Sequence, residues 1–252
     1  MTARGVNPTP SWFTVPPNGQ AKIRLFCFPY AGGSSLIFRT WGKALGPSIA
    51  VCPAHLPGRE RRLTEKPYTS ARSLVDAVAE AIIPHLDRPF AFFGHSMGAL
   101  ISFELARQLR RLNMPSPLHL FLSGRAAPQR REFKESITYN LPAKEFAEEL
   151  RRLNGTPREV LEHQELMELM IPLLKADFEI CQTYNYTQEP ALDCPITAFG
   201  GLSDHEATGE MIDAWREQTT RSFRLCMMPG DHFFLHSAQD RILTILLQEL
   251  QS

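Results

Sequence analysis

Short apolar runs recur along the chain and alternate with stretches of helical periodicity. The runs are nearly continuous rather than alternating in polarity, which is typical of strands buried on both faces of a sheet. Because helices are expected between most of the runs, the pattern predicts an α/β fold with a mostly parallel, doubly wound sheet. Reactive loops of such a sheet lie at the carboxyl ends of its strands. The predicted strands are Ile23–Phe28, Ile49–Cys52, Phe90–Phe93, Leu118–Leu122, Ile196–Phe199 and Phe223–Met228.

The predicted helices carry apolar residues at intervals of three or four positions, which places them on one face. The first helix follows Ser70, a candidate N-cap, and the second follows Ser96. A third covers Arg241–Leu250, and a fourth is expected at about Glu206–Thr219. The apolar stripe of the first helix consists of Leu74, Val78, Ile82 and Leu86.

The segment from Arg130 to about Gln188 interrupts the alternation, because it contains no clear strand. One helix is predicted after Leu141-Pro142, and Thr156-Pro157-Arg158-Glu159 is typical of a capping box that starts another. A helical subdomain packed on the core is the simpler interpretation, but the many Met and Leu residues favour a lid over an apolar pocket. We therefore predict four segments. They are an N-terminal arm (1–20), a first part of the core (21–129), a helical lid insertion (130–190) and a second part of the core (191–252).

Composition excludes several classes of function. The chain has 252 residues, of which 43% are hydrophobic, and its 27 basic residues balance its 27 acidic ones. A net charge of zero lacks the basic signature of nucleic-acid binders, so no such partner is expected. The five cysteines show no CxxC spacing, and neither a disulfide framework nor a zinc site is predicted. With no signal peptide and no apolar stretch of membrane-spanning length, we expect a cytoplasmic protein without a membrane span.

The strongest local signal is Gly94-His95-Ser96-Met97-Gly98, which lies between a predicted strand and a predicted helix. This placement is typical of a nucleophile elbow, in which a strained turn exposes the serine hydroxyl above the sheet. Any side chain at Gly94 or Gly98 is expected to clash with the neighbouring strand or helix. The start of the helix also places the Met97 N–H beside the reacting oxygen, as one donor of an oxyanion hole.

A serine hydroxyl needs a base, and His232 follows the last predicted strand, where a catalytic histidine is expected. His205 and His236 are competitors, and His95 is interpreted as a packed loop residue. The spacing of His232 and His236 resembles a zinc motif, but no third ligand suggests itself, so no metal is expected.

Two further groups complete the predicted site. Asp204 follows the strand Ile196–Phe199 and precedes His232, which gives the order Ser, Asp, His; Asp231 is a rival acid. The second oxyanion donor is expected after the first strand, from the backbone of Ala31, with Tyr30 as the alternative. A glycine-rich connection without a catalytic role is the simpler interpretation of that loop.

The chain resembles the type II thioesterases that accompany polyketide synthases and non-ribosomal peptide synthetases, within the α/β-hydrolase fold. The resemblance extends from about Lys22 to the C-terminus and depends on five motifs in order. They are Phe28-Pro29-Tyr30-Ala31-Gly32-Gly33, Leu56-Pro57-Gly58-Arg59-Glu60, Gly94-His95-Ser96-Met97-Gly98-Ala99, Ser123-Gly124-Arg125-Ala126-Ala127-Pro128 and His232-Phe233-Phe234-Leu235.

This resemblance implies hydrolysis of acyl groups held as thioesters on the phosphopantetheine arms of acyl or peptidyl carrier proteins. The family's triad maps onto Ser96, Asp204 and His232, and its oxyanion donors map onto the backbones of Ala31 and Met97. No cofactor is implied beyond the phosphopantetheine of the substrate carrier. Two features depart from the family pattern: Asp231 replaces a frequent glycine, and the N-terminal arm is long.

Other interpretations of the motifs stay open at this point. A general esterase or acyl-CoA hydrolase, or an acyltransferase, would use the same triad, whereas a binding protein that kept the fold would usually lose one of its members. Arg59 and Arg125 lie in matching motifs and have a positive charge that suits a phosphate, although ion pairs between loops are the commoner role of such arginines.

Overall fold

Six parallel strands form the single sheet of the computed structural model, which describes residues 11–17, 19–130, 137–153 and 163–251. The strand order is β2-β1-β3-β4-β5-β6, and every neighbouring pair is parallel. This arrangement confirms the predicted mostly parallel sheet. The strands are β1 (Ile23–Phe28), β2 (Ile49–Pro53), β3 (Phe90–His95), β4 (Leu120–Ser123), β5 (Ile196–Gly201) and β6 (Phe223–Met228).

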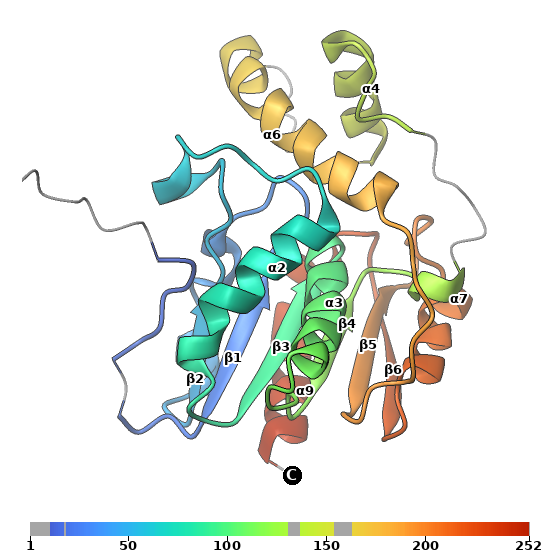
Figure 1. Cartoon of the computed structure of the whole chain (residues 1–252). Helices are drawn as coiled ribbons and strands as arrows, with labels where there is room; N and C mark the ends of the chain where they lie inside the picture. Colours follow the sequence, from blue (N-terminus) through green and yellow to red (C-terminus); the bar gives the residue numbers. More distant parts are fainter. Residues whose placement is uncertain (1–10, 18, 131–136, 154–162, 252) are drawn as a thin grey trace, which may run out of the picture.

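Helices cover both faces of the sheet, and in Figure 1 α2 and α3 lie in front of it while α9 lies behind. They are α1 (Trp41–Leu45), α2 (Ala71–Ile82), α3 (Met97–Arg111), α4 (Ala143–Leu153), α6 (Gln164–Thr183), α7 (Gly209–Asp213), α8 (Phe234–Ser237) and α9 (Gln239–Gln251). Short 3-10 helices are Ser35–Phe38, Glu60–Arg62, Ile83–His85, Pro128–Arg130 and Ala214–Gln218.

Successive strand residues point to opposite faces, and this alternation builds two apolar layers. Phe26 and Phe92 belong to the layer that includes α2 and α3. Leu25 and Phe93 belong to the layer that includes α1 and α9. Because both faces of each central strand are buried, the strands contain continuous apolar runs, as the sequence pattern indicates.

Three sequence predictions need correction. The helix expected at about Glu206–Thr219 is wrong as a single element, because Thr208 caps the later, shorter α7, which a 3-10 helix continues. The fourth strand begins at Leu120 rather than Leu118, whose side chain is exposed. Ser70 occupies the N-cap position of α2, but its side chain makes no capping hydrogen bond.

Two aromatic residues attach the described part of the N-terminal arm, which begins at residue 11, to the rest of the protein. Phe13 is only 3% exposed, forms an isolated bridge with Ala54, and packs its ring edge-on against Phe26. Trp12 stacks under the guanidinium group of Arg62, 3.9 Å from the ring centre. Phe13 is therefore part of the hydrophobic core.

Between β4 and β5 lies the helical insertion predicted at 130–190, and it carries α4 and α6. The two helices share a small apolar cluster with Phe146 and Leu174. They lie above the carboxyl edge of the sheet in Figure 1. The predicted capping box at Thr156-Pro157-Arg158-Glu159 lies outside the described residues. Among the described helices, none combines the length and apolarity that crossing a membrane requires.

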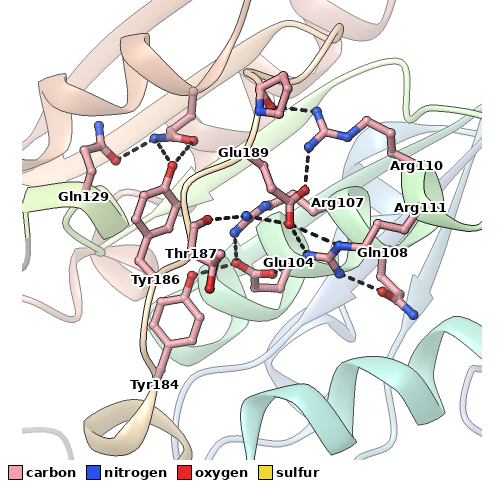
Figure 2. Close-up of polar contacts among 12 residues, drawn as sticks. Glu104, Arg107, Gln108, Arg110, Arg111, Gln129, Tyr184, Tyr186, Thr187 and Glu189 are labelled. Carbon is pink, nitrogen blue, oxygen red and sulfur yellow. Dashed lines mark hydrogen bonds and ion pairs between the residues drawn. The ribbon is translucent and has the colours of Figure 1, made fainter.

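A network of charged groups fastens the segment after α6 to α3 (Figure 2). Glu189 forms ion pairs of 2.8, 2.7 and 2.7 Å with three arginines of α3. Although partial burial opposes ionisation, hydrogen bonds from two of these arginines lower the pKa of Glu189 to about 2. Tyr184 donates to Glu104 at 2.6 Å, and Glu104 pairs with Arg107. We call these residues the linker cluster: Glu104, Arg107, Arg110, Arg111, Tyr184 and Glu189.

Candidate active site

The loops after β1, β3, β5 and β6 contain the predicted site residues, all at the carboxyl edge of the sheet. A cavity of about 390 Å³ is lined by Ala31, Ser96 and His232, which come from three of these loops. Asp204, from the fourth, is hydrogen-bonded to His232. Residues separated by about two hundred positions, Ala31 and His232, are thus brought to one site.

Ser96 occupies a strained turn between β3 and α3, with φ 54° and ψ −110°. A Cβ atom at Gly94 would lie 2.0 Å from the Gly98 carbonyl oxygen, and one at Gly98 would lie 2.0 Å from the Phe28 oxygen. The predicted clashes at both glycines are therefore confirmed. Positive φ at a serine is costly, and its presence here is typical of a nucleophile elbow.

His232 and Asp204 form the hydrogen bond that a triad requires. The Nδ1 atom of His232 lies 2.8 Å from Oδ2 of Asp204, whose side chain is fully buried. The other carboxylate oxygen accepts the N–H groups of Glu206 and Ala207. With Nδ1–H donated to Asp204, the Nε2 atom of His232 is left to act as the base.

The rival residues have other partners. One carboxylate oxygen of Asp231 accepts the N–H of Phe233, and the His236 ring contacts the Tyr30 hydroxyl at 3.0 Å. His205 lines the cavity but is exposed. In the described part of the chain, no group of three or more His, Cys, Asp or Glu side chains is placed to hold a metal ion.

His95 has a role that the motif analysis missed. It ends β3 with its side chain completely buried, and its Nε2 lies 2.9 Å from the His232 carbonyl oxygen. Burial, and then the charge of the neighbouring His232, lower the pKa of His95 well below its ordinary value, so the ring is neutral. Nε2–H donates to that carbonyl, and Nδ1 accepts from Ser123 Oγ at 2.9 Å. His95 therefore holds the loop that carries His232.

The loop after β1 retains two candidate oxyanion donors. The N–H of Gly32 donates to Asp177 Oδ2 at 2.7 Å, and the N–H of Gly33 donates to the Tyr30 carbonyl. The proline that opens the loop has no N–H. This leaves the N–H groups of Tyr30 and Ala31, the same two alternatives that the sequence offered.

Met97 supplies the other candidate donor. It is the first residue of α3 and is completely buried. Because the first N–H groups of a helix have no acceptor within the helix, the Met97 N–H is available to a developing negative charge.

The two motif arginines differ in their contacts. Arg59 is 6% exposed and forms an ion pair with Asp177 of α6, as the ion-pair interpretation expected. For Arg125 that interpretation is wrong within the described residues: its guanidinium group contacts Cys181 Sγ at 3.7 Å and lines the cavity.

The helical insertion supplies part of the cavity wall. Leu150 of α4 and Leu174 and Phe178 of α6 line the cavity that contains Ser96. A second cavity, of about 620 Å³, is lined in part by the loop after β1 and shares Tyr30, Ala31 and Leu174 with the first. The insertion therefore contributes apolar side chains to the cavity wall, and its role as a lid stays a prediction.

A parallel sheet with a nucleophile elbow, an Asp–His pair and a helical insertion between strands defines the chain as an α/β-hydrolase. The family model for the thioesterase domain matches residues 23–250, and the chain belongs to that family. It is therefore a serine-type thioesterase in fold and family.

Named relatives agree with this assignment. The gramicidin S biosynthesis protein GrsT of Aneurinibacillus migulanus is 48% identical, over 93% of this chain and 91% of that protein. The RedJ thioesterase from the prodiginine pathway of Streptomyces coelicolor superposes with a TM-score of 0.86 at 43% identity, covering 91% of each chain. The type II thioesterase BorB from the borrelidin cluster has a TM-score of 0.87 at 34% identity, covering 96% of this chain and 99% of that chain.

Proposed function

We propose that this chain hydrolyses acyl thioesters held on the phosphopantetheine arms of acyl or peptidyl carrier proteins, through an acyl-serine intermediate. The observation that carries the proposal is the Asp204–His232 hydrogen bond of 2.8 Å beside the strained Ser96, at one cavity. The partner class is supported by relatives named for gramicidin S, prodiginine and borrelidin biosynthesis. We also propose a cytoplasmic location, which five free cysteines support.

The proposed reaction has two halves. His232 Nε2 takes the proton of Ser96 as Oγ attacks the thioester carbonyl, and the buried Asp204 stabilises the imidazolium that forms. Negative charge on the carbonyl oxygen is stabilised by the N–H groups of Ala31 and Met97. The intermediate collapses, the proton passes from His232 to the pantetheine sulfur, and the thiol leaves.

In the second half, water replaces the thiol. His232 takes a proton from a water molecule, which attacks the acyl-serine carbonyl, and the same two N–H groups stabilise the second oxyanion. The proton then returns to Ser96 Oγ as the acid leaves. This sequence uses only side chains and backbone groups of the chain and requires no metal or redox cofactor.

The acyl group is proposed to lie in the cavity of about 390 Å³. Its walls from Leu150, Leu174 and Phe178 suit a hydrocarbon chain, because apolar contact area supplies binding without fixed geometry. The choice between hydrolysis and transfer depends on whether water or another acceptor reaches the acyl-serine.

The test compares one acyl group on a loaded carrier protein and on coenzyme A, with the native chain and Ser96→Ala. We expect release that depends on Ser96 and favours the carrier. Equal or better turnover of the coenzyme A thioester would instead identify a general acyl hydrolase. Stable acylation of the protein without release would identify an acyltransferase, and binding of the carrier without acylation would identify a scaffold.

A further inference from the structure

A carboxylate from the helical insertion reaches into the loop that carries Ala31. Asp177 of α6 is 1% exposed, and its Oδ2 accepts the Gly32 N–H at 2.7 Å. The same carboxylate binds Arg59 through both oxygens, at 2.9 and 2.8 Å. Arg59 also donates to the Gly33 carbonyl at 3.0 Å. We call this contact the α6 clamp: the side chains of Asp177 and Arg59 with the backbone groups of Gly32 and Gly33.

The clamp fixes the backbone directly after Ala31. Gly32 has φ +73°, a conformation that side chains rarely adopt, and a Cβ there would lie 2.4 Å from Leu174 Cδ2. Leu174 lies one helical turn before Asp177, so α6 both covers the loop and accepts its N–H. Two consecutive residues are thereby held, one through its donor and one through its acceptor.

Glu60, which follows Arg59 in the same motif, also supports the loop after β1. Ser35 follows the loop, and its hydroxyl donates to Glu60 at 2.7 Å. Glu60 also contacts His55 Nδ1 at 3.0 Å, and it has φ 49°. The neighbouring residues Arg59 and Glu60 thus connect the loop after β2 to the loop after β1.

We propose that Asp177 is a positioning residue of the oxyanion hole, which acts through Arg59 and Gly32 to aim the Ala31 N–H at the thioester oxygen. The inference rests on the proposed function, because it takes Ala31 as a donor. In this proposal α6 does more than line the acyl cavity, because the position of this helix determines whether the Ala31 N–H can stabilise the oxyanion.

Stability alone does not account for the pair. Burying two charges costs desolvation, and well-packed apolar side chains of similar volume are often as stable as a buried ion pair. Apolar side chains could fasten α6 to the core equally well, but they could not accept the Gly32 N–H or donate to the Gly33 carbonyl. The polar groups of the clamp match the polar groups of the loop.

The test uses two variants and a matched control. Asp177→Asn keeps the shape of the side chain and removes its charge. The double variant Arg59→Met/Asp177→Leu removes both charges, so it leaves no unpaired ion to unfold the protein. Glu189→Gln is the control, because it weakens another ionic attachment of the insertion without touching the β1 loop. Melting temperatures establish that each variant is folded.

Steady-state kinetics are measured with acetyl- and octanoyl-pantetheine, together with inhibition by a boronic acid that forms a tetrahedral adduct on serine. For the double variant we expect kcat to fall about 10- to 100-fold, below the loss that removal of a whole oxyanion donor causes. The factor should be the same for both acyl groups, KM should change little, and the inhibition constant should rise in parallel with the loss of kcat.

Three results would overturn the inference: wild-type kcat in the folded double variant, a loss confined to the octanoyl substrate, or an equal loss in Glu189→Gln. A loss confined to the long chain would place Asp177 in acyl binding. Failure of the proposed function gives a different pattern. An acyltransferase or a scaffold would release neither acyl group even as the wild-type protein, and a general acyl hydrolase would be identified by turnover of the coenzyme A thioester that equals or exceeds that of the loaded carrier.

Discussion

The α6 clamp and the linker cluster both fasten the helical insertion to the core with ion pairs, yet they differ in surroundings and partners. The clamp is buried, with side chains 6% and 2% exposed, and it binds backbone groups next to Ala31. The linker cluster has more ion pairs, but Glu189 is 23% exposed and Arg111 42% exposed. The number of ion pairs therefore does not indicate their importance for function. The linker cluster attaches the segment after α6 to α3, whereas the clamp fixes the conformation of a loop at the active site.

Removal of the nucleophile is expected to cause the largest loss of activity, with which the effects of changing the two contacts can be compared. We expect Ser96→Ala to lower kcat by about 10⁴- to 10⁶-fold, because it removes the hydroxyl that forms the acyl intermediate. The measurement is acyl release from a loaded carrier protein, with melting temperature as the control. Residual activity within tenfold of the wild type would contradict the triad.

Breaking the clamp from one side is expected to have the largest effect on stability. Asp177→Ala leaves the Arg59 guanidinium buried without its counter-ion, which costs about 3–5 kcal/mol. For a chain of this size, that corresponds to a fall in melting temperature of about 6–20 °C.

The double variant Arg59→Met/Asp177→Leu supplies the control for this prediction. It should recover most of the lost melting temperature, because the unpaired charge is removed. If Asp177→Ala melts within 2 °C of the wild type, Asp177 is not needed to compensate a buried charge on Arg59.

His95 positions a second catalytic loop, the one that carries His232, as the clamp positions the loop after β1. His95→Ala removes the donor to the His232 carbonyl and so breaks a part-buried hydrogen bond that holds the loop. We expect kcat to fall about 10- to 100-fold, because small displacements of a catalytic base are costly. Steady-state kinetics with acetyl-pantetheine measure it. His95→Gln, whose amide can donate to the same carbonyl, should retain more activity than His95→Ala; the reverse order would count against a positioning role.

The linker cluster should give a smaller change. Glu189→Gln weakens two partly exposed ion pairs, with Arg110 and Arg111. It also weakens one with the buried Arg107, which keeps Glu104 as a partner. Such pairs typically contribute about 0.3–0.5 kcal/mol each. We expect the melting temperature to fall by about 2–6 °C. Acyl-release kinetics should stay within about twofold of the wild type, and a loss of kcat as large as that of the clamp variants would erase the distinction between the two contacts.

The smallest expected effect is the loss, at low pH, of the stability that the Glu189 ion pairs contribute. The pKa of Glu189 is lowered from 4.5 to about 2 in the folded protein, so its ion pairs stabilise the fold fully above pH 4.5. This contribution is lost as pH falls from 4.5 towards 2. The gap in melting temperature between wild type and Glu189→Gln should be constant from pH 7 to 5 and shrink at pH 3.5. A difference in melting temperature that grows as the pH falls would contradict a stabilising role of the ionised Glu189.

The sequence predicts the sheet and the candidate triad well because both depend on local patterns. Buried parallel strands appear as apolar runs, and the glycines around Ser96 are required by close contacts with Phe28 and with α3. Asp204 and His232 follow strands directly, so sheet topology alone brings them to one edge.

Contacts that depend on three-dimensional placement are not readable in the same way. The partner of Arg59 is Asp177, 118 positions away on a helix of the insertion, and nothing in the local sequence distinguishes Asp177 from a solvated carboxylate. His95 is adjacent to the nucleophile in sequence, but its partner is a carbonyl 137 positions away. The motifs around Arg59 and His95 signal that a role exists without indicating the groups they hold.

The most direct measurement of the central claim is the mass of the protein quenched within the first turnover of an octanoyl-loaded carrier protein. We predict a gain of one octanoyl group, located by peptide mapping on Ser96 and missing in Ser96→Ala. Release of octanoate without acylation of Ser96, or an octanoyl group on another residue, would contradict it.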